Sequence, residues 1–512
     1  MTEISLLAAY LMGSLWLLSC GLNACILIIL YLRAFPGGKA VRRRQRLGAV
    51  QSGWTHPEQV PVITTQVPLY NELNVAERVI RAVAAMEYPA GKHEIQILDD
   101  STDETKVLVD RVAASLRKTG KDIQVVRRSD RVGFKAGALE AGRNISKGEF
   151  LAVFDGDFVP NPDFLKKMMP YFLEDAKVGL VQARWGHLNR RDSLLTRAQS
   201  LGIDGHFTVE QSARSATGLL MNFNGSAGIW RRRAIEEAGG WGYDTLTEDL
   251  DLSYRAQLAG WKARFVPEVV VPAELPDTVA AFKSQQFRWA KGSIQTAVKL
   301  MPSVLRSERS WFHKVSGFFH LTHFAIHPCL VLLALLSLPL ITIAGPRVDP
   351  GWFVAAGLIL SLASHAPSAL YWLSQKRSGI PWPLRLMGIP LVLITGVGIA
   401  ISNARAVGEA LIGKQSEFVR TPKCGDAAGR TYQVKMPTLP LLEIALSGYC
   451  WYVVVQLFLS GKWFLAPFLL INAVGFGYIG LLGILQSFPS RQPPKQSGRV
   501  QFDTSPAHPS LR

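Results

Sequence analysis

The sequence predicts an α/β domain with a doubly wound, mainly parallel sheet, joined to a bundle of α-helical membrane spans. Residues 61–185 alternate between short apolar runs and amphipathic helical patterns, with short connections between them. Apolar runs long enough to cross a bilayer stand on both sides of this region. The 512-residue chain has 48% hydrophobic and 19% charged residues, which is too apolar for an ordinary soluble protein and too charged for one lying wholly within a membrane.

The first apolar run covers residues 4–32 and is expected to be an uncleaved membrane anchor that occupies residues 1–34. Glu3 stands where a signal peptide carries positive charge, and the run is longer than the apolar core of such a peptide. Residues 35–60 follow as a basic juxtamembrane linker, which holds this end of the anchor in the cytoplasm.

The formal net charge is +17, which indicates either a nucleic-acid partner or cytoplasmic loops beside membrane spans. The basic residues concentrate beside the apolar runs, and no nucleic-acid recognition module is visible in the sequence. We therefore expect membrane lipids, and no nucleic acid, among the partners.

Residues 303–486 form the expected membrane region, with further candidate spans near residues 320–344, 351–374, 439–460 and 463–486. Segment 384–402 is also apolar, but basic residues flank it on both sides, so neither flank suits the outer face of a membrane. We expect this segment to be interfacial or re-entrant, which leaves five spans with the N-terminus outside and the C-terminus inside. Residues 487–512, rich in Pro, Ser, Gln and Arg, are expected to be a disordered tail.

Residues 61–302 form the expected α/β domain. Its predicted strands are at residues 62–65, 95–98, 123–126, 150–154 and 178–182, and its predicted helices are at residues 75–83, 104–118 and 133–144. Ligands bind such sheets at the carboxyl ends of the strands. Three groups of polar residues fall there, namely Pro68 to Glu72, Asp99-Asp100, and Asp155-Gly156-Asp157.

These acidic strand ends indicate a phosphate-containing ligand held through a metal ion. The sequence has neither a glycine-rich dinucleotide loop nor a Walker lysine motif. Because carboxylates repel phosphate, a divalent cation is implied, and Mg²⁺ binds one or two carboxylates together with phosphate oxygens. Gly156 lets the backbone turn so that Asp155 and Asp157 converge. Lys135, near a predicted helix start, either adds positive charge beside a diphosphate or is an ordinary solvated lysine.

Two later motifs each have two interpretations. Thr247-Glu248-Asp249 begins a helical pattern with Thr247 as the expected N-cap, and its acids complement the helix dipole. Alternatively Asp249 is a general base, which requires burial or a nearby acid to raise its pKa. The block from Gln285 to Trp289 suits a sugar or diphosphate, with Trp stacking on a ring while Arg and Gln donate hydrogen bonds. Alternatively it is an interfacial cluster beside the membrane.

The motifs, in this order, resemble those of one known family. The matching blocks are Pro68 to Glu72, Gln96 to Asp103, Phe134 to Leu139, Phe154 to Phe158, Val181 to Trp185, His206 to Gln211, Phe223 to Gly228, Thr247 to Leu252 and Gln285 to Trp289. They resemble the processive family 2 glycosyltransferases with a GT-A fold, of the cellulose-synthase-like type, above all the plant A and C groups of mannan and glucan synthases. The resemblance is close over residues 60–300. In the membrane half it rests mainly on the arrangement of the apolar segments.

The resemblance implies a role for each matching position. Nucleotide-sugar binding is implied for Pro68, Tyr70, Glu72, Asp99, Asp100, Lys135 and Asp155. Mg²⁺ or Mn²⁺ binding is implied for Asp155 and Asp157, and contacts with the acceptor and diphosphate for Glu248, Gln285, Arg288 and Trp289. Catalysis is implied for Asp249, which would deprotonate the acceptor hydroxyl, and for Asp100.

The implied reaction is an inverting transfer of a hexose from UDP-glucose or GDP-mannose to a growing β-linked polysaccharide, a β-1,4-glucan or a mannan-like polymer. The same motifs occur in glycolipid synthases, which add a single β-glucose to diacylglycerol or ceramide, so this alternative stays open. A non-catalytic channel or transporter is a third class, but it would need no acidic strand ends.

Residues 413–425 contain Phe418 to Lys423, which resembles the gating loop of bacterial cellulose synthases, although Arg420 replaces a valine of that motif. Such a loop must face the cytosol in order to cap the site. We expect a multi-pass protein of the plasma (inner) membrane with a cytoplasmic catalytic domain, and the sequence leaves an accessory subunit open.

Overall fold

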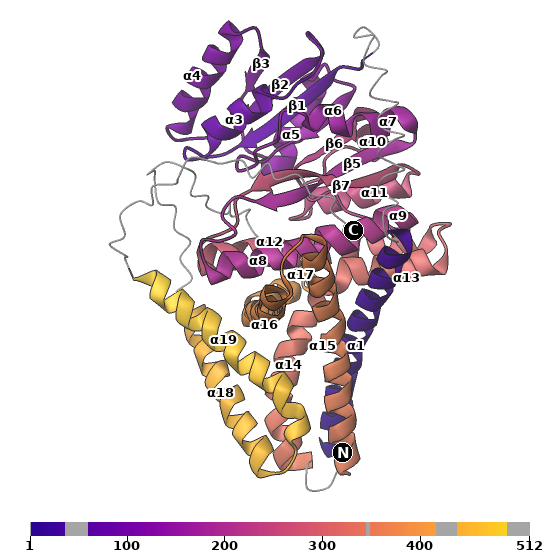
Figure 1. The fold of residues 1–512 in the computed structure, drawn as a ribbon, viewed down its shortest axis with the longest axis vertical. Helices are drawn as coiled ribbons and strands as arrows, with labels where there is room; N and C mark the ends of the chain where they lie inside the picture. Colours follow the sequence, from indigo (N-terminus) through magenta and orange to yellow (C-terminus); the bar gives the residue numbers. More distant parts are fainter. Residues whose placement is uncertain (1, 36–59, 345–348, 416–437, 489–512) are drawn as a thin grey trace.

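The computed structural model describes residues 2–35, 60–344, 349–415 and 438–488. Figure 1 shows two halves along the long axis, with a β-sheet and its helices at one end and long helices, including α1 (Thr2–Ala34), at the other. Most of the predicted linker 35–60, the block Phe418 to Lys423 and the tail from residue 489 lie outside the described residues.

Within the described residues, the sheet has seven strands in the order β3-β2-β1-β4-β6-β5-β7. The strands are β1 (Ile63–Leu69), β2 (His93–Asp99), β3 (Asp122–Val126), β4 (Phe150–Val153), β5 (Val178–His187), β6 (Gly228–Arg231) and β7 (Lys262–Ala273). β6 pairs antiparallel with β4 and β5, and the other pairs are parallel. The predicted doubly wound, mainly parallel sheet is confirmed, and β1 to β5 coincide with the predicted strands.

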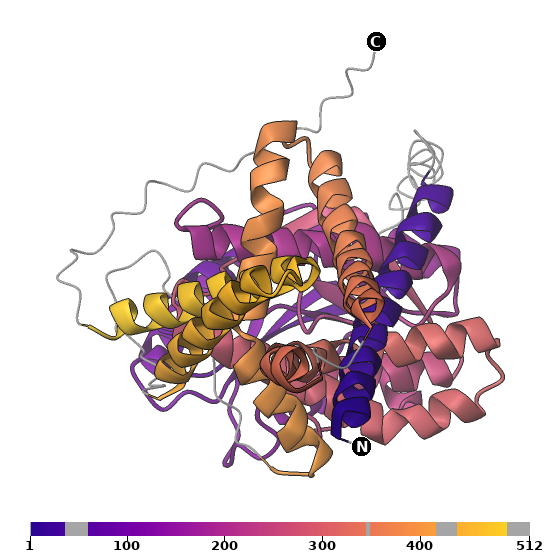
Figure 2. The ribbon, with the colours of Figure 1, turned by 90° about the horizontal axis from the view of Figure 1, so that it is seen from below.

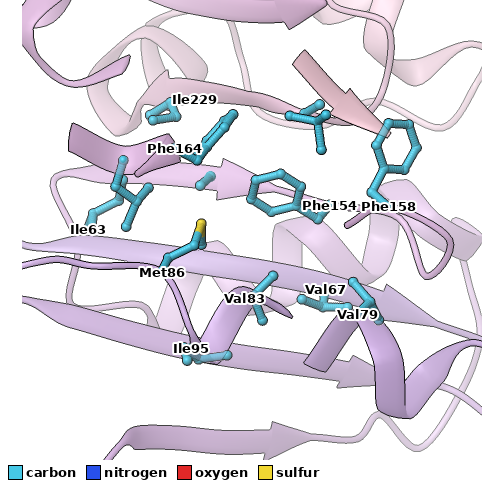
Figure 3. Close-up of a cluster of buried hydrophobic side chains, with 14 of the residues drawn as sticks. Ile63, Val67, Val79, Val83, Met86, Ile95, Phe154, Phe158, Phe164 and Ile229 are labelled. Carbon is cyan, nitrogen blue, oxygen red and sulfur yellow. The ribbon is translucent and has the colours of Figure 1, made fainter. Parts of the chain in front are cut away.

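Alternation along the strands places apolar side chains on both faces of the sheet. Ile95 of β2 packs into one core with α3 (Ala76–Ala84) and α4 (Thr105–Lys118). Figure 3 shows part of this core, in which Val67 lies beside Val79 of α3 and Ile63 lies toward Met86. Leu98, three residues further along β2, packs into a second core with α5 (Phe134–Ile145).

Further helices complete the half that contains the sheet, which is called the catalytic half below because the predicted site residues lie in it. They are α6 (Phe164–Met168), α7 (Pro170–Glu174), α8 (Leu194–Gly205), the π-helix η3 (His206–Gln211), α9 (Ser212–Thr217), α10 (Arg232–Glu237), α11 (Glu248–Leu258) and α12 (Val279–Arg306). The proposed domain boundary at residue 302 falls inside α12, which joins the catalytic half to the membrane half.

The regular elements of the membrane half are all helices within its described residues. Its elements are α13 (Trp311–Thr322), η4 (His323–Ala325), α14 (Ile326–Pro339), η5 (Leu340–Ala344), α15 (Pro350–Arg377), α16 (Trp382–Gly398), α17 (Ala400–Leu411), α18 (Leu439–Leu459), η6 (Trp463–Leu465) and α19 (Ala466–Ser487). In the described part of the chain, five helices are long and apolar enough to cross a membrane: Ile4–Ala34, Trp311–Ile343, Gly351–Arg377, Leu439–Leu459 and Trp463–Ser487. They coincide with the five predicted spans.

Segment 384–402 lies in α16 and α17, which meet at a bend of 47°. Counted together as one span, this bent pair would bring the number of candidate spans in the described residues to six. Figure 1 views α16 end-on whereas Figure 2 shows it lengthwise, so α16 lies across the direction of α1 and α15. It packs against α8 of the catalytic half and against α19. This orientation supports an interfacial or re-entrant position, which stays a prediction.

Candidate active site

One cleft at the carboxyl end of the sheet is lined by nearly all of the predicted site residues. Pro68, Tyr70, Glu72, Asp100, Lys135, Asp155, Asp157, Glu248, Asp249, Gln285, Arg288 and Trp289 line its wall. They come from β1, β2 and β4, from the first turns of α5 and α11, and from α12. Residues as far apart in the sequence as Pro68 and Trp289 therefore meet at one place, at the strand ends where the fold class predicts a ligand site.

Asp99 is the exception among the predicted nucleotide-sugar ligands. Its side chain is fully buried, and its carboxylate accepts two hydrogen bonds from Arg127, at 3.0 and 2.9 Å, and one from the backbone N–H of Ser101. Asp99 and Asp100 are neighbours at the end of β2, so their side chains leave the backbone in opposite directions. The structure therefore brings only Asp100 into the cleft.

Two arginines that were not predicted as site residues contact Tyr70 and Asp100 of the cleft. Arg128 donates from Nε and Nη2 to the two carboxylate oxygens of Asp100, at 3.1 and 2.5 Å. The guanidinium of Arg131 lies 3.2 Å from the ring centre of Tyr70, in a cation–π arrangement. Both arginines follow β3, which is the neighbour of β2 in the sheet. Their position after a strand could have identified them as residues of the ligand-binding edge.

Asp155 and Asp157 lie at the carboxyl end of β4. The backbone N–H of Asp155 donates to Ser226 Oγ at 3.0 Å, and one oxygen of the buried Asp157 carboxylate accepts from the backbone N–H of Glu274 at 3.3 Å. Both carboxylates face the cleft, and carboxylate oxygens are the ligands that Mg²⁺ and Mn²⁺ prefer. The donor set therefore fits a divalent cation.

Lys135 lies among carboxylates rather than in solvent. Its ammonium is 2.6 Å from Asp155 Oδ1 and 3.9 Å from Glu248 Oε1, and it donates to the carbonyl oxygen of Gly225 at 2.7 Å. Burial acts to lower the pKa of Lys135, but Asp155, Glu248 and Asp249 outweigh it, so the pKa is raised and the lysine stays charged. The interpretation of an ordinary solvated lysine is wrong.

Gly156 is required where β4 ends, because its backbone passes directly against Glu72. A Cβ at this position would lie 1.7 Å from Glu72 Oε2. Gly156→Ala is expected to weaken nucleoside diphosphate binding roughly 10-fold, since Glu72 and the Asp155–Asp157 turn must separate. Titration calorimetry with GDP or UDP measures this affinity. Gly408→Ala is the matched control, because a Cβ at Gly408 meets open space. Unchanged affinity in Gly156→Ala would show that this contact is unimportant for the nucleotide.

Asp249 lies in the first turn of α11, beside the Lys135 and Glu248 side chains. Loss of hydration and the neighbouring Glu248 charge raise the pKa of Asp249 to about 7, while Lys135 and a hydrogen bond from the N–H of Leu250 partly oppose this. The two conditions that the sequence analysis set for a general base, burial and a nearby acid, are both met. Gly225, with φ of 82°, brings the backbone so close that a Cβ would lie 2.7 Å from Asp249 Oδ2.

α12 supplies Gln285, Arg288 and Trp289 from one side of the cleft. The Trp289 ring centre lies 6.5 Å from that of Trp185 on β5, so two indoles stand together in the wall of the cleft. Gly292 lets α12 pack directly on the start of α11, because a Cβ there would lie 2.5 Å from Thr247 Cγ2.

Thr247 occupies the N-cap position of α11, as predicted, but within the described chain it makes no capping hydrogen bond through its side chain. Its hydroxyl lies 3.3 Å from that of Thr296 on α12. The close packing of α12 over this turn explains the difference, because it draws the hydroxyl away from the helix that it begins.

Comparisons with known proteins agree with this geometry. The profile of the family described as "Glycosyltransferase like family 2" matches residues 61–292. Glucomannan 4-beta-mannosyltransferase 7 of Arabidopsis thaliana is 32% identical over 82% of this chain and 77% of its own length. Glucomannan 4-beta-mannosyltransferase 2 of the same plant is 34% identical over 84% of this chain and 82% of its own length. Glucomannan 4-beta-mannosyltransferase 1 of Cyamopsis tetragonoloba is 31% identical over 90% of this chain and 88% of its own length.

Among solved structures, the mannosyltransferase PcManGT of Pyrobaculum calidifontis, in complex with GDP-Man and Mn²⁺, superimposes with a TM-score of 0.50 at 20% identity. The match covers 77% of this chain and all of that one, and it shows a shared GT-A fold. With the family match, the identity to the plant enzymes and the assembled cleft, the chain belongs to glycosyltransferase family 2 and is a hexosyltransferase of the cellulose-synthase-like type.

Proposed function

We propose that this protein transfers mannose from GDP-mannose to a growing β-1,4-linked mannan or glucomannan. The observation that carries the proposal is the position of Asp249, a carboxylate with a pKa near 7, in the same cleft as Asp155, Asp157 and Trp289. A base, a cation site and an aromatic sugar platform are the parts that an inverting transfer needs. The relatives that share about a third of its residues are named glucomannan 4-beta-mannosyltransferases, which supports mannose as the sugar.

In this proposal the nucleotide lies against Tyr70 at the end of β1 and Asp100 at the end of β2, and the diphosphate lies toward Lys135. Asp155 and Asp157 would hold Mg²⁺ or Mn²⁺, which supplies positive charge to the departing diphosphate. Asp249 accepts the proton of the acceptor hydroxyl, and that oxygen bonds to the anomeric carbon as the bond to the diphosphate breaks. Gln285, Arg288, Trp289 and Glu248 orient the acceptor sugar and the diphosphate. One displacement converts an α-linked donor into a β-linked product.

The proposal predicts a pH dependence from Asp249. Asp249 accepts a proton only as the carboxylate, and its pKa is raised to about 7. The value of kcat/KM is therefore expected to fall as the pH drops below about 7 and to level off above it. Initial rates from about pH 5 to pH 9, in buffers of constant ionic strength, measure this. A rate that stays flat down to the acid end would exclude Asp249 as the titrating base.

We place the catalytic half in the cytoplasm and the spans in the plasma (inner) membrane, where the spans offer the polymer a path outward. Cys424 tests the orientation, because it adjoins the block Phe418 to Lys423. In a variant that keeps Cys424 as its only cysteine, a membrane-impermeant thiol reagent is expected to label inside-out vesicles and to spare intact cells. Labelling from outside intact cells would put the block on the wrong face and remove its gating role.

The donor and product are tested on purified protein in lipid, incubated with Mn²⁺ and labelled GDP-mannose or UDP-glucose. We expect release of GDP and a labelled product that elutes as a polymer on gel filtration. A product that partitions into organic solvent would favour a glycolipid synthase, and exclusive use of UDP-glucose would favour a glucan synthase. Absence of nucleoside diphosphate release from either donor would overturn the assignment of a transferase reaction.

A further inference from the structure

α12 has two faces with different roles. At about 100° per residue, Gln285, Arg288 and Trp289 fall within about 100° of one another and line the cleft. Lys283 and Lys291 fall about 80° apart on the other side of the same helix. Figure 1 shows α12 between the sheet and the membrane half, so the second face is directed toward the membrane helices.

Both lysines form buried ion pairs with helices of the membrane half. Lys283 Nζ lies 2.6 Å from Glu443 Oε2 on α18, and the two side chains are 1% and 0% exposed. Lys291 Nζ lies 3.0 Å from Glu409 Oε2 on α17, with side chains 0% and 10% exposed. Glu409 also pairs with Arg405 at 2.9 Å.

A third contact ties the start of α12 to the last helix of the chain. The backbone N–H of Val279 donates to Gln486 Oε1 on α19 at 2.7 Å. α12 is thus bonded to α17, α18 and α19 at three points along its length. Glu409 and Glu443 also stand on opposite sides of residues 416–437 in the sequence, which contain the gating-like block.

Stability alone does not explain such pairs. Removing two charges from water costs several kcal/mol for each ion, and well-packed apolar side chains of similar volume are often as stable or more so. What an ion pair adds is direction, because an ammonium donates to a carboxylate oxygen at one distance and along a narrow set of angles. A pair at each end of the Gln285–Trp289 block therefore constrains both the rotation and the axial position of that block.

We propose that Lys283 and Lys291 are positioning residues, whose pairs with Glu443 and Glu409 set the rotation of α12 and hence the placement of Gln285, Arg288 and Trp289 against the acceptor sugar. This inference rests on the proposed transferase function. It concerns the acceptor sugar and the diphosphate, which these three residues are proposed to orient, whereas the nucleotide base is placed against Tyr70 and Asp100 at the ends of β1 and β2. The membrane half thereby sets acceptor affinity without contacting the acceptor.

The test uses the full-length protein in lipid, with a short β-1,4-manno-oligosaccharide as acceptor and GDP-mannose as donor. Lys283→Met alone leaves Glu443 buried without its partner and is at risk of misfolding. The double variant Lys283→Met with Glu443→Met removes both charges. It is expected to melt like wild type but to raise the acceptor KM about 10-fold or more, with a smaller loss of GDP affinity, because most of the nucleotide contacts come from other elements. The charge-exchanged variant, Lys283→Glu with Glu443→Lys, is expected to return the acceptor KM toward wild type.

Glu77→Gln on α3 is the matched control, because it removes an ion pair with Arg81 that is exposed and remote from α12. It is expected to leave the acceptor KM unchanged. A double-Met variant with the wild-type acceptor KM would overturn the proposal. A charge-exchanged variant whose acceptor KM did not return toward wild type would also overturn it. Packing, rather than the ion pair, would then determine the rotation of α12. A wild-type protein that transfers no hexose would instead overturn the proposed function, before any variant is compared.

Discussion

Asp249→Asn is expected to lower hexose transfer by about 10²–10⁴-fold, the usual range for loss of general base catalysis. Asparagine keeps the size of the side chain, and its oxygen still accepts the hydrogen bond from the N–H of Leu250. It cannot accept the acceptor's proton, however. Donor binding is expected to survive, because the nucleotide end of the cleft is formed by other elements. Single-turnover rates of nucleoside diphosphate release and calorimetric titration with GDP measure the two quantities separately.

Asp244→Asn is a suitable control for this variant. It makes the same chemical change five residues earlier, at a carboxylate that is 60% exposed and paired with Lys299. Near wild-type transfer is expected from it. If Asp249→Asn kept more than about a tenth of wild-type turnover, the base role would belong to another residue, and the acids of α11 would serve only to complement the helix dipole.

Removal of divalent metal is expected to reduce transfer by at least about 10²-fold, because a bound cation supplies several kcal/mol of charge stabilisation to the leaving diphosphate. Excess EDTA should stop turnover, and added Mn²⁺ or Mg²⁺ should restore it. Asp155→Asn and Asp157→Asn should each weaken binding of GDP in the presence of Mn²⁺, which calorimetry detects without any turnover.

The matched control is Asp122→Asn, since Asp122 lies at the amino end of β3, away from the cleft, and pairs with Lys147 at the surface. It is expected to leave both metal dependence and GDP affinity unchanged. Full turnover in excess EDTA would contradict the metal role of Asp155 and Asp157, and would leave Lys135, 2.6 Å from Asp155, as the cation that faces the diphosphate.

Local patterns predicted the first five strands, because burial on both faces of a parallel sheet produces short apolar runs. They also predicted α3, α4 and α5, but not the short helices α6 and α7 between β4 and β5. The ends of those strands then identified Tyr70, Asp100, Asp155 and Asp157 as residues of one cleft. Asp99 was assigned to the same site only because it is adjacent to Asp100 in the sequence. The pleat of β2 turns its side chain to Arg127 instead.

The features that the sequence analysis missed depend on contacts between distant segments. β6 and β7 follow long helical insertions, and β6 enters the sheet antiparallel between β4 and β5. Gly292 is required only because α12 packs on Thr247, and the pairs of Lys283 and Lys291 join residues more than 100 positions apart. Such contacts leave no periodic pattern in the local sequence, so they could not be predicted from it. Arg128 and Arg131 differ, because their place after β3 could have been read as a strand-end signal.

The anomeric configuration of the product tests the central claim most directly, namely that Asp249 drives a single in-line displacement on a sugar donor. Purified protein in lipid is supplied with GDP-mannose, Mn²⁺ and a short manno-oligosaccharide, and the product is analysed by NMR and by methylation linkage analysis. A β-1,4-linked mannose extending the acceptor is the predicted result. An α-linked product would require a second displacement or a different reacting group, and it would contradict the role of Asp249 and the mechanism built on it.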